Sequence, residues 1–359
     1  MLFIPHKHLY ISGTSYVSAD EPDYKEVITD ANSRRRMGRL LKMAVWCGLK
    51  SLDGVPSERV AGIITSTGAG FMKDTISFGS SIFDREETLL NPSPFMQSTF
   101  NTASGYIALI RKIHAYNTTY VQQADGFAAS LVDAAMLLDD AGEGNVALVG
   151  AFDEVTPEVD VIRQRLGLYR VGDGFLPLGE GAAAFLLSAA MPTDVSESCP
   201  ATESSAGPGG DDGSESGSER GGDANSECST GPLQESESAS WPCDESGSES
   251  SSEHLHESGG TSSSSLNGTK DGNAALRFCG LANLSDLPKC AENPIAELFG
   301  INAGVNVISC ADHVESLGAF RSLLPVLLCK LISEQKIPDG YTAIVDDVNE
   351  DGVIVLLHK

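Results

Sequence analysis

Residues 118–126 decide how the fold of this chain is interpreted, and they read Thr118-Thr119-Tyr120-Val121-Gln122-Gln123-Ala124-Asp125-Gly126. The β-branched and aromatic residues at the start of this run favour a strand, and Gly126 favours a tight turn. After the turn, apolar residues recur at helical spacing from Phe127 to Leu138. The run therefore predicts a buried strand that passes through a tight turn into a helix, with Gln123 at the turn.

Strand and helix signals alternate along the chain on both sides of this run. Short runs of apolar and β-branched residues predict strands, and apolar residues three or four apart predict helices. The strands are expected at Leu9–Val17, Val60–Thr65, Val146–Val149 and Ala182–Leu187, and the helices at 37–49 and 103–114. Strands without a polar face, placed between helices, indicate sheets that are covered on both sides. The sequence therefore predicts an α/β fold.

Regular structure is predicted to resume at Ala275, after a long polar interruption. The expected elements are a helix at Ile295–Phe299, a strand at Val305–Ser309, a single helix at Leu317–Ile332, and a hairpin of Tyr341–Val345 with Val353–Leu357. The run from Asn349 to Gly352 suits the turn of that hairpin.

The interruption, residues 191–274, has the composition of a disordered segment. Ser, Glu and Gly dominate it, and the part from Asp194 to Ala274 holds 17 acidic and 2 basic residues, a net charge of −15 out of −26 for the chain. Such a segment has too little apolar surface to offset the entropy of an ordered chain. The acidic balance disfavours nucleic acid or an anionic membrane as a partner.

The eight cysteines are scattered, and none forms a CxxC pair. The sequence shows no secretion signal and no apolar stretch near the roughly 18 residues of a membrane-spanning helix. Reduced thiols and a cytoplasmic location are therefore expected. Cysteines and histidines in the acidic segment match no standard zinc-ligand spacing, and these are Cys199, Cys228, Cys243, His254 and His256. We expect no metal and no cofactor.

Four segments within residues 1–188 together resemble the N-terminal domain of the beta-ketoacyl synthases, a family of the thiolase-like superfamily. They are Arg35–Leu40, the run from Asn91 to Gly105, the strand–turn–helix around Gln123 with Val146–Glu154 after it, and Asp173–Phe175 followed by Gly179–Ala184. The last of these resembles the family's "DG-F…GEGA" segment and is the most specific. Its Glu180 is expected to be a structural carboxylate in a tight turn.

The resemblance implies that Gln123 stands where an active ketosynthase carries its nucleophilic cysteine. Gly126 lies three residues later, as the small residue of the family does, and an alternative register at Asp125 supplies no cysteine either. The run Gln123-Ala124-Asp125-Gly126 looks like the "QAGG" run of chain-length factors, the non-condensing partners of type II polyketide ketosynthases. An amide side chain cannot form an acyl-thioester.

The other catalytic positions implied by the family are also altered. Its first histidine is expected near 281–286, yet no histidine lies between His256 and His313. Its lysine is expected around Val307–Ser309, and none of these residues is basic. His313 is the one candidate for a remaining catalytic histidine, with a structural role as the alternative.

The fold implied by the resemblance is thiolase-like, layered αβαβα, with mixed five-stranded sheets and a truncated second half. We expect a ketosynthase-like domain at 1–190, a disordered acidic insertion at 191–274 and a residual ketosynthase-like portion at 275–359. The family is dimeric, which implies a dimer through Thr118–Gln122.

Three hypotheses of function follow. The first is a non-catalytic chain-length-factor-type subunit of fatty-acid or polyketide (aryl-polyene-like) biosynthesis, partnered by an intact ketosynthase and an acyl carrier protein. The second is an active 3-oxoacyl synthase that uses Asp125 or Ser130 with His313 as base. The third is a homodimeric scaffold without catalysis.

Overall fold

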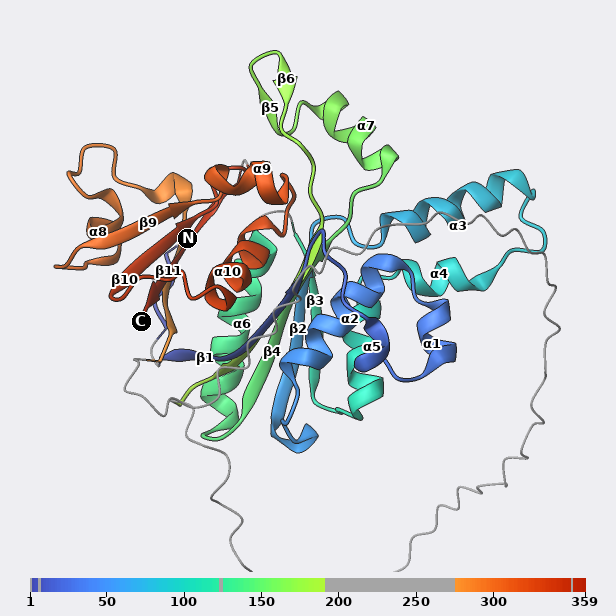
Figure 1. Cartoon of the computed structure of the whole chain (residues 1–359), viewed down its shortest axis with the longest axis horizontal. Helices are drawn as coiled ribbons and strands as arrows, with labels where there is room; N and C mark the ends of the chain where they lie inside the picture. The colour runs from blue at the N-terminus through green and yellow to red at the C-terminus, as the bar shows by residue number, and fades with distance from the viewer. Residues whose placement is uncertain (1, 6–7, 123–124, 191–274, 350) are drawn as a thin grey trace, which may run out of the picture. The chain divides into compact units, whose positions relative to one another are not determined.

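Nine strands of the described residues form one mixed sheet (Figure 1). The computed structural model describes residues 2–5, 8–122, 125–190, 275–349 and 351–359. The sheet has the order β3-β2-β4-β7-β1-β8-β11-β10-β9. Its strands are β1 (Leu9–Val17), β2 (Val60–Thr67), β3 (Tyr116–Val121), β4 (Val146–Asp153), β7 (Gly181–Ser188), β8 (Arg277–Asn283), β9 (Val305–Ser309), β10 (Tyr341–Val345) and β11 (Val353–His358). A separate small hairpin pairs β5 (Arg170–Val171) with β6 (Gly174–Phe175).

The sheet consists of two halves with the same plan. In the first half, β2 pairs in parallel with both β3 and β4, and β7 runs antiparallel between β4 and β1. In the second half, β9 pairs in parallel with β10, and β11 runs antiparallel between β10 and β8. Within the described part of the sheet, strands β1 and β8 join the halves through two residue pairs, Leu9 with Phe278 and Tyr10 with Arg277. Among the described residues, the second half has no counterpart of the edge strand β3.

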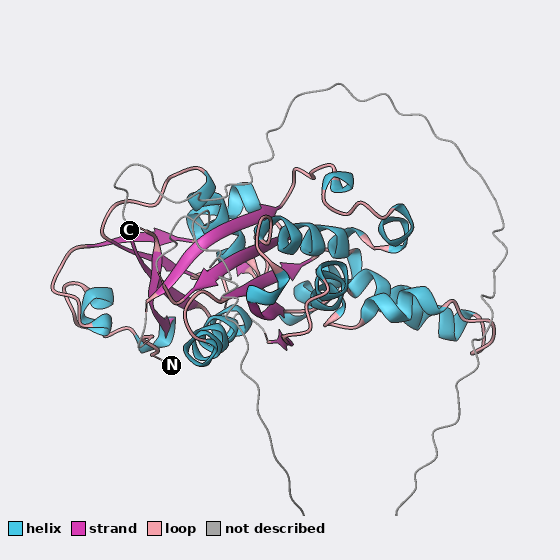
Figure 2. Cartoon of the chain, turned by 90° about the horizontal axis from the view of Figure 1, so that it is seen from below, coloured by secondary structure: helices cyan, strands magenta, loops and turns pink. Residues whose placement is uncertain are grey.

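Helices cover both faces of each half, which gives the five layers of the expected fold (Figures 1 and 2). Helices α2 (Arg39–Ser51) and α5 (Thr102–Arg111) pack on the outer face of the first half. Helices α6 (Asp125–Ala141) and α10 (Leu323–Ser333) lie between the two halves, and α8 (Pro294–Phe299) covers the outer face of the second. The thiolase-like αβαβα prediction is therefore confirmed, with five strands in the first half and four in the second.

The burial of alternate side chains explains why the central strands have no polar face. On β7, Ala183, Phe185 and Leu187 face the central helices. The residues between them, Ala182, Ala184 and Leu186, face α2 and α5. Helix α10 is buried almost all round, because it is enclosed by both halves of the sheet.

The single helix predicted over Leu317–Ile332 is wrong, because the chain breaks it at Gly318. A short helix, α9 (Val314–Leu317), ends there, and α10 begins only at Leu323. Gly318 has a φ of 77°, which ends a helix. The next residue turns to the first half of the chain, where the Ala319 amide donates to the Pro177 carbonyl at 2.7 Å. The tertiary pairing overrides the apolar periodicity of the sequence.

The remaining helices lie outside the five layers. They are α1 (Ala31–Arg36), α3 (Met72–Asp84), α4 (Pro92–Ser98) and α7 (Pro157–Leu166), with short 3-10 turns at Tyr24–Glu26, Ser57–Arg59, Leu284–Asp286 and Ala311–His313. Helices α3 and α4 extend away from the sheet as an arm (Figure 1). No helix in the described ranges is long and apolar enough to cross a bilayer.

The predicted domain boundaries at 190 and 275 stay predictions. The described residues belong to one compact unit of the chain. The acidic insertion predicted at 191–274 lies outside the described residues.

Candidate functional site

The turn between β3 and α6 is the place where the sequence predicted the site. Strand β3 ends at Val121 and α6 begins at Asp125, whereas Gln123 and Ala124 lie outside the described residues. Gly126 is buried, and a side-chain Cβ there would lie 3.3 Å from the Cβ of Ser66 on β2. A small residue at this helix start therefore lets α6 approach the sheet closely, which matches the pattern noted in the sequence.

A cavity of about 500 Å³ opens beside this turn. The end of β3 contributes Tyr120 and Gln122, and one face of α6 contributes the residues from Ala128 to Met136 that are spaced by helical turns. The full lining comprises Phe3, Tyr120, Gln122, Ala128, Ala129, Val132, Asp133, Met136, Leu281, Ala282, Asn283 and Val353. The structure thus brings β3, α6 and the end of β8 together around one space.

The cavity lining lacks the groups that condensation chemistry requires. Residues 281–286, where the family's first catalytic histidine is expected, do reach the cavity, because Leu281, Ala282 and Asn283 line it. None of these residues is basic, and the described lining residues include no cysteine, histidine, lysine or arginine. A ketosynthase needs a thiolate as nucleophile and hydrogen-bond donors for the enolate oxygen. The described walls supply no group able to act as that nucleophile.

Asp133 is the acidic residue of this wall, and two tyrosines of β3 face it. The Tyr116 hydroxyl donates a hydrogen bond to Asp133 Oδ2 at 3.0 Å. Two effects raise the pKa of Tyr120 to about 12: burial, which is the larger, and the negative charge of Asp133. Burial and the hydrogen bond to Asp133 also raise the pKa of Tyr116. The sequence analysis assigned no role to Asp133.

The other candidates from the sequence do not line this cavity. His313 is half-buried in the turn after β9, where its backbone amide donates to the Cys310 carbonyl at 3.0 Å. Ser130 is fully buried inside α6, and its hydroxyl donates to the Gly126 carbonyl at 2.8 Å. The side chain of Asp125 lies outside the described residues. Catalytic roles for these three residues stay predictions.

A buried carboxylate, Asp153, links the two halves of the chain near the carboxyl ends of the strands. Asp153 Oδ1 accepts hydrogen bonds from the Thr67 hydroxyl and from the amides of Gly68 and Ala69, at 2.9–3.2 Å. Its Oδ2 accepts from the Ser322 hydroxyl at 2.5 Å, just before α10. Burial raises the pKa of Asp153, and these donors act in the opposite direction. The sequence interpretation missed this residue, although an acid that ends an otherwise apolar strand was a usable signal.

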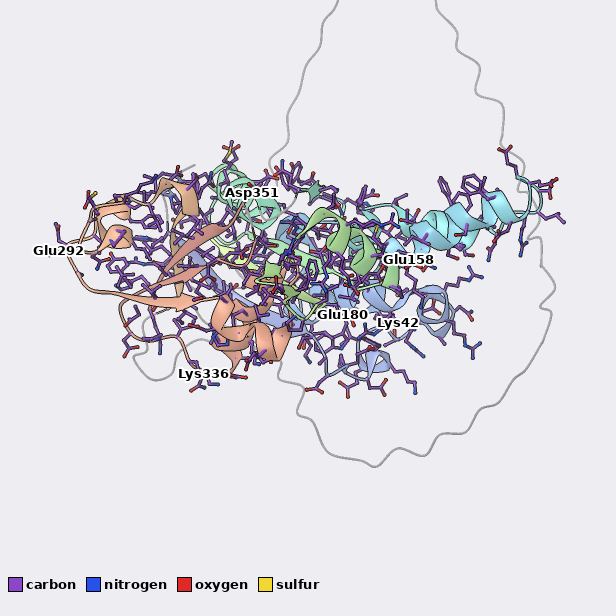
Figure 3. All side chains as sticks on the ribbon, turned by 90° about the horizontal axis from the view of Figure 1, so that it is seen from above. Lys42, Glu158, Glu180, Glu292, Lys336 and Asp351 are labelled. Atoms are coloured by element: carbon purple, nitrogen blue, oxygen red, sulfur yellow. The ribbon has the colours of Figure 1, made fainter. Side chains whose placement is uncertain are left out.

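Glu180 is held in contacts to neighbouring segments. Figure 3 labels its side chain. It forms an ion pair with Arg39 at the start of α2 and accepts from the Val155 amide at 3.3 Å. Arg39 also pairs with Glu21. These contacts tie the GEG turn to α2 and to the end of β4. Among the described residues, no group of three or more His, Cys, Asp or Glu side chains is arranged to hold a metal ion.

Comparison with known proteins defines the class of this fold. Residues 14–172 match the family model of the beta-ketoacyl synthase N-terminal domain. The ishigamide ketosynthase/chain length factor shares 13% identity over 98% of this chain and 99% of its own, with a TM-score of 0.58. A type II polyketide synthase acyl-carrier protein in complex with its ketosynthase bound to the hexaketide, AntDE:AntF, shares 14% identity over 98% and 99%, with a TM-score of 0.56.

A further match lies below the level that shows a common fold. The ketosynthase ApeO in complex with its chain length factor ApeC, from Xenorhabdus doucetiae, aligns with 50% of this chain and 79% of its own at 16% identity, with a TM-score of 0.38. No curated protein matches the sequence.

The fold is that of the thiolase-like α/β proteins. Residues 14–172 are similar to the beta-ketoacyl synthase N-terminal domain, so the resemblance predicted from the four sequence segments is confirmed.

Proposed function

We propose that this chain is a non-catalytic subunit of the chain-length-factor type, which assembles with an intact ketosynthase. One observation carries the proposal. The cavity beside the β3–α6 turn has no cysteine, histidine or lysine among its described lining residues, and the sequence places Gln123 at the family's nucleophile position. Without a thiol, histidine or lysine in its described lining, the cavity is suited to enclosing part of a substrate but not to transferring it.

The edge of the sheet supports an assembly with a second subunit. Strand β3 is the last strand of its half, so one side of its backbone has no partner among the described residues. An unpaired strand edge is a site for strand addition. Large apolar side chains surround it, with Leu109 77% and Tyr116 45% exposed. The β3 edge therefore fits the dimer surface that the family resemblance implies.

The arm formed by α3 and α4 carries a second group of exposed apolar side chains. Phe83 is 85% and Leu89 is 90% exposed, and Phe95 and Met96 are also exposed. Glu86, Glu87 and Leu89 all adopt left-handed backbone conformations at the arm's tip. Such conformations cost free energy, and exposed apolar clusters are typical of protein interfaces. A partner subunit that buries the arm would offset this cost.

The choice of partner rests on the solved structures of similar fold. They include a ketosynthase/chain length factor and an acyl-carrier protein in complex with its ketosynthase. We propose that an intact ketosynthase pairs with this chain, and that an acyl carrier protein delivers substrate to the pair. The acidic insertion at 191–274 has no assigned role in this proposal.

The test is co-expression with an intact ketosynthase encoded beside this chain. Size-exclusion chromatography with light scattering measures the stoichiometry, and mass spectrometry locates the acyl group after incubation with acyl-loaded carrier protein. The proposal expects a one-to-one complex that is acylated only on the ketosynthase cysteine. Acylation of this chain would support the active-enzyme hypothesis, and a homodimer indifferent to the ketosynthase would support the scaffold hypothesis.

A further inference from the structure

The cavity beside β3 combines apolar walls with the carboxylate of Asp133, which has no cationic partner among the described residues. We propose that this cavity receives the cationic side chain, an arginine or a lysine, of the subunit that pairs with β3. The inference rests on the proposed function, because it assumes that β3 is an interface strand. It requires the partner to supply a cationic side chain, which the exposed apolar surface alone does not require.

The position of Asp133 makes it reachable from the β3 edge. The carboxylate is half-buried on α6 and accepts the Tyr116 hydroxyl at 3.0 Å. Tyr116 belongs to the edge strand and is itself 45% exposed. The tyrosine hydroxyls of β3 therefore hold the carboxylate next to this edge strand and not deep in the core.

Asp133 forms no ion pair with a cation of the described residues. In the described parts of the chain, no lysine, arginine or histidine forms an ion pair with Asp133, and none lines the cavity. Strand β3 itself contains no charged residue. A carboxylate that becomes buried at an interface without a counter-charge weakens association, whereas a cation from the partner restores it.

The walls of the cavity match the shape of a long cationic side chain. Ala129, Val132 and Met136 give an apolar path along α6 that leads to Asp133. Lysine and arginine bury their methylene stems on such surfaces and place the charged head on a carboxylate. An arginine guanidinium can also form a cation–π interaction with the ring of Tyr120 on the same wall.

A second copy of this chain supplies no such cation from β3. In a symmetric antiparallel pair centred on Thr118 and Thr119, Tyr116 and Tyr120 lie on either side of the two-fold axis. Both copies then present Asp133 near the axis, because the two sides of such an interface are identical. The nearest cations in sequence, Lys112 and His114, precede the strand and are exposed. The geometry therefore favours a heterodimer.

The experiment measures heterodimer affinity for four forms of the full-length chain against the intact ketosynthase, by titration at low and high salt. Asp133→Asn removes the charge, and Met136→Lys supplies an internal cation one helical turn away. Asp140→Asn removes an exposed acid from the same helix and serves as the matched control. We expect Asp133→Asn and Met136→Lys to weaken binding by about 10- to 100-fold and to flatten its salt dependence. The control should bind as the parent chain does.

The outcomes separate this inference from the proposed function. If the parent chain forms no heterodimer, both fail. If the heterodimer forms and Asp133→Asn binds with unchanged affinity and salt dependence, only the present inference fails. A tight homodimer that is insensitive to Asp133→Asn and lost in Lys112→Gln would also overturn it. Unchanged thermal unfolding of Asp133→Asn would exclude misfolding as the cause of weaker binding.

Discussion

The backbones of Gly179 and Gly318 pass so close to each other that neither position has room for a side chain. A Cβ on Gly179 would lie 1.8 Å from the Leu317 carbonyl oxygen, and a Cβ on Gly318 would lie 2.2 Å from the Gly179 nitrogen. The Gly179 amide donates to the Ala319 carbonyl at 3.2 Å. This contact fastens the GEG turn of the first half to the α9–α10 connection of the second.

Gly179→Ala is therefore expected to destabilise the protein by about 1–3 kcal/mol or more, because the added methyl group meets rigid backbone. Urea unfolding measures the change. The matched control is Gly79→Ala in the interior of α3, where a Cβ meets nothing within 4 Å. There the gain in helix propensity should stabilise by roughly 0.5–1 kcal/mol. Equal effects of the two substitutions would contradict the close approach.

The stability of the Asp153→Asn variant, measured as its free energy of unfolding, should rise relative to that of the parent protein as the pH increases from about 4. Burial raises the pKa of Asp153 in the folded state above its unfolded value. Its stabilising contribution is therefore complete below the unfolded pKa, about 3.9, and is lost as the pH rises through the folded pKa. In the parent protein this loss amounts to about 1.4 kcal/mol for each pH unit by which the folded pKa exceeds the unfolded one. The asparagine variant does not titrate and therefore does not lose this stability.

The measurement for Asp153→Asn is the unfolding free energy of both proteins at pH 4.5, 6 and 7.5. Asp140→Asn, at an exposed position, should run parallel to the parent protein over this range. A difference between Asp153→Asn and the parent that stays constant with pH would show that Asp153 has an ordinary pKa.

Thiol labelling should distinguish the cysteines of the described residues. Burial raises the pKa of the Cys47, Cys310 and Cys329 thiols, whereas Cys290 is exposed. Because the thiolate is the reactive form, iodoacetamide at pH 8 should modify Cys290 faster than the three buried thiols by on the order of 100-fold or more. Peptide mass spectrometry after timed quenching reads the rates. Rapid labelling of Cys310 in folded protein would reveal an opening that the structure does not contain.

Gln123→Cys should not create a condensing enzyme. The substitution restores a thiol at the family's nucleophile position, yet no described residue of the cavity is a histidine or lysine that promotes malonyl decarboxylation. We expect no elongation of acyl-carrier thioesters by the purified variant, measured by mass spectrometry of the carrier protein. Elongated product from Gln123→Cys would mean that catalytic groups outside the described lining complete the site.

The two halves of the sheet differ in what they expose. The first half ends at β3 and the second at β9, whose Val307 is 56% exposed. Strands β4 and β10 occupy equivalent places in the two halves. Each leads to a buried acid, because β4 ends at Asp153 and Asp346 directly follows β10. The Asn349 side chain donates to Asp346 at 2.8 Å, and the Tyr169 hydroxyl donates to Asn349 at 2.8 Å. The second half thus keeps its links to the first without a strand equivalent to β3.

Local sequence was sufficient to predict the helices and strands that bury apolar side chains at regular spacing. The range expected for β1, Leu9–Val17, is the range observed, and β9 also matches. Hydrophobic periodicity fails at Leu317–Ile332, because the register there is fixed by a hydrogen bond from Ala319 to Pro177 and not by neighbours in sequence. The cavity escaped prediction for the same reason, since its walls come from β3, α6, β8, β11 and the N-terminal segment.

The sequence by itself determined the resemblance of residues 14–172 to the beta-ketoacyl synthase N-terminal domain, the layered α/β class and the absence of a cysteine at position 123, because motif order, hydrophobic period and residue identity are local properties. Only the tertiary structure decided that Leu281 and Gln122 share a cavity, that Asp153 meets Ser322, and that Asp133 accepts a hydrogen bond from Tyr116 of β3. These contacts join residues far apart in the chain. The distance between them is set by how helices pack on a sheet, which no local pattern encodes.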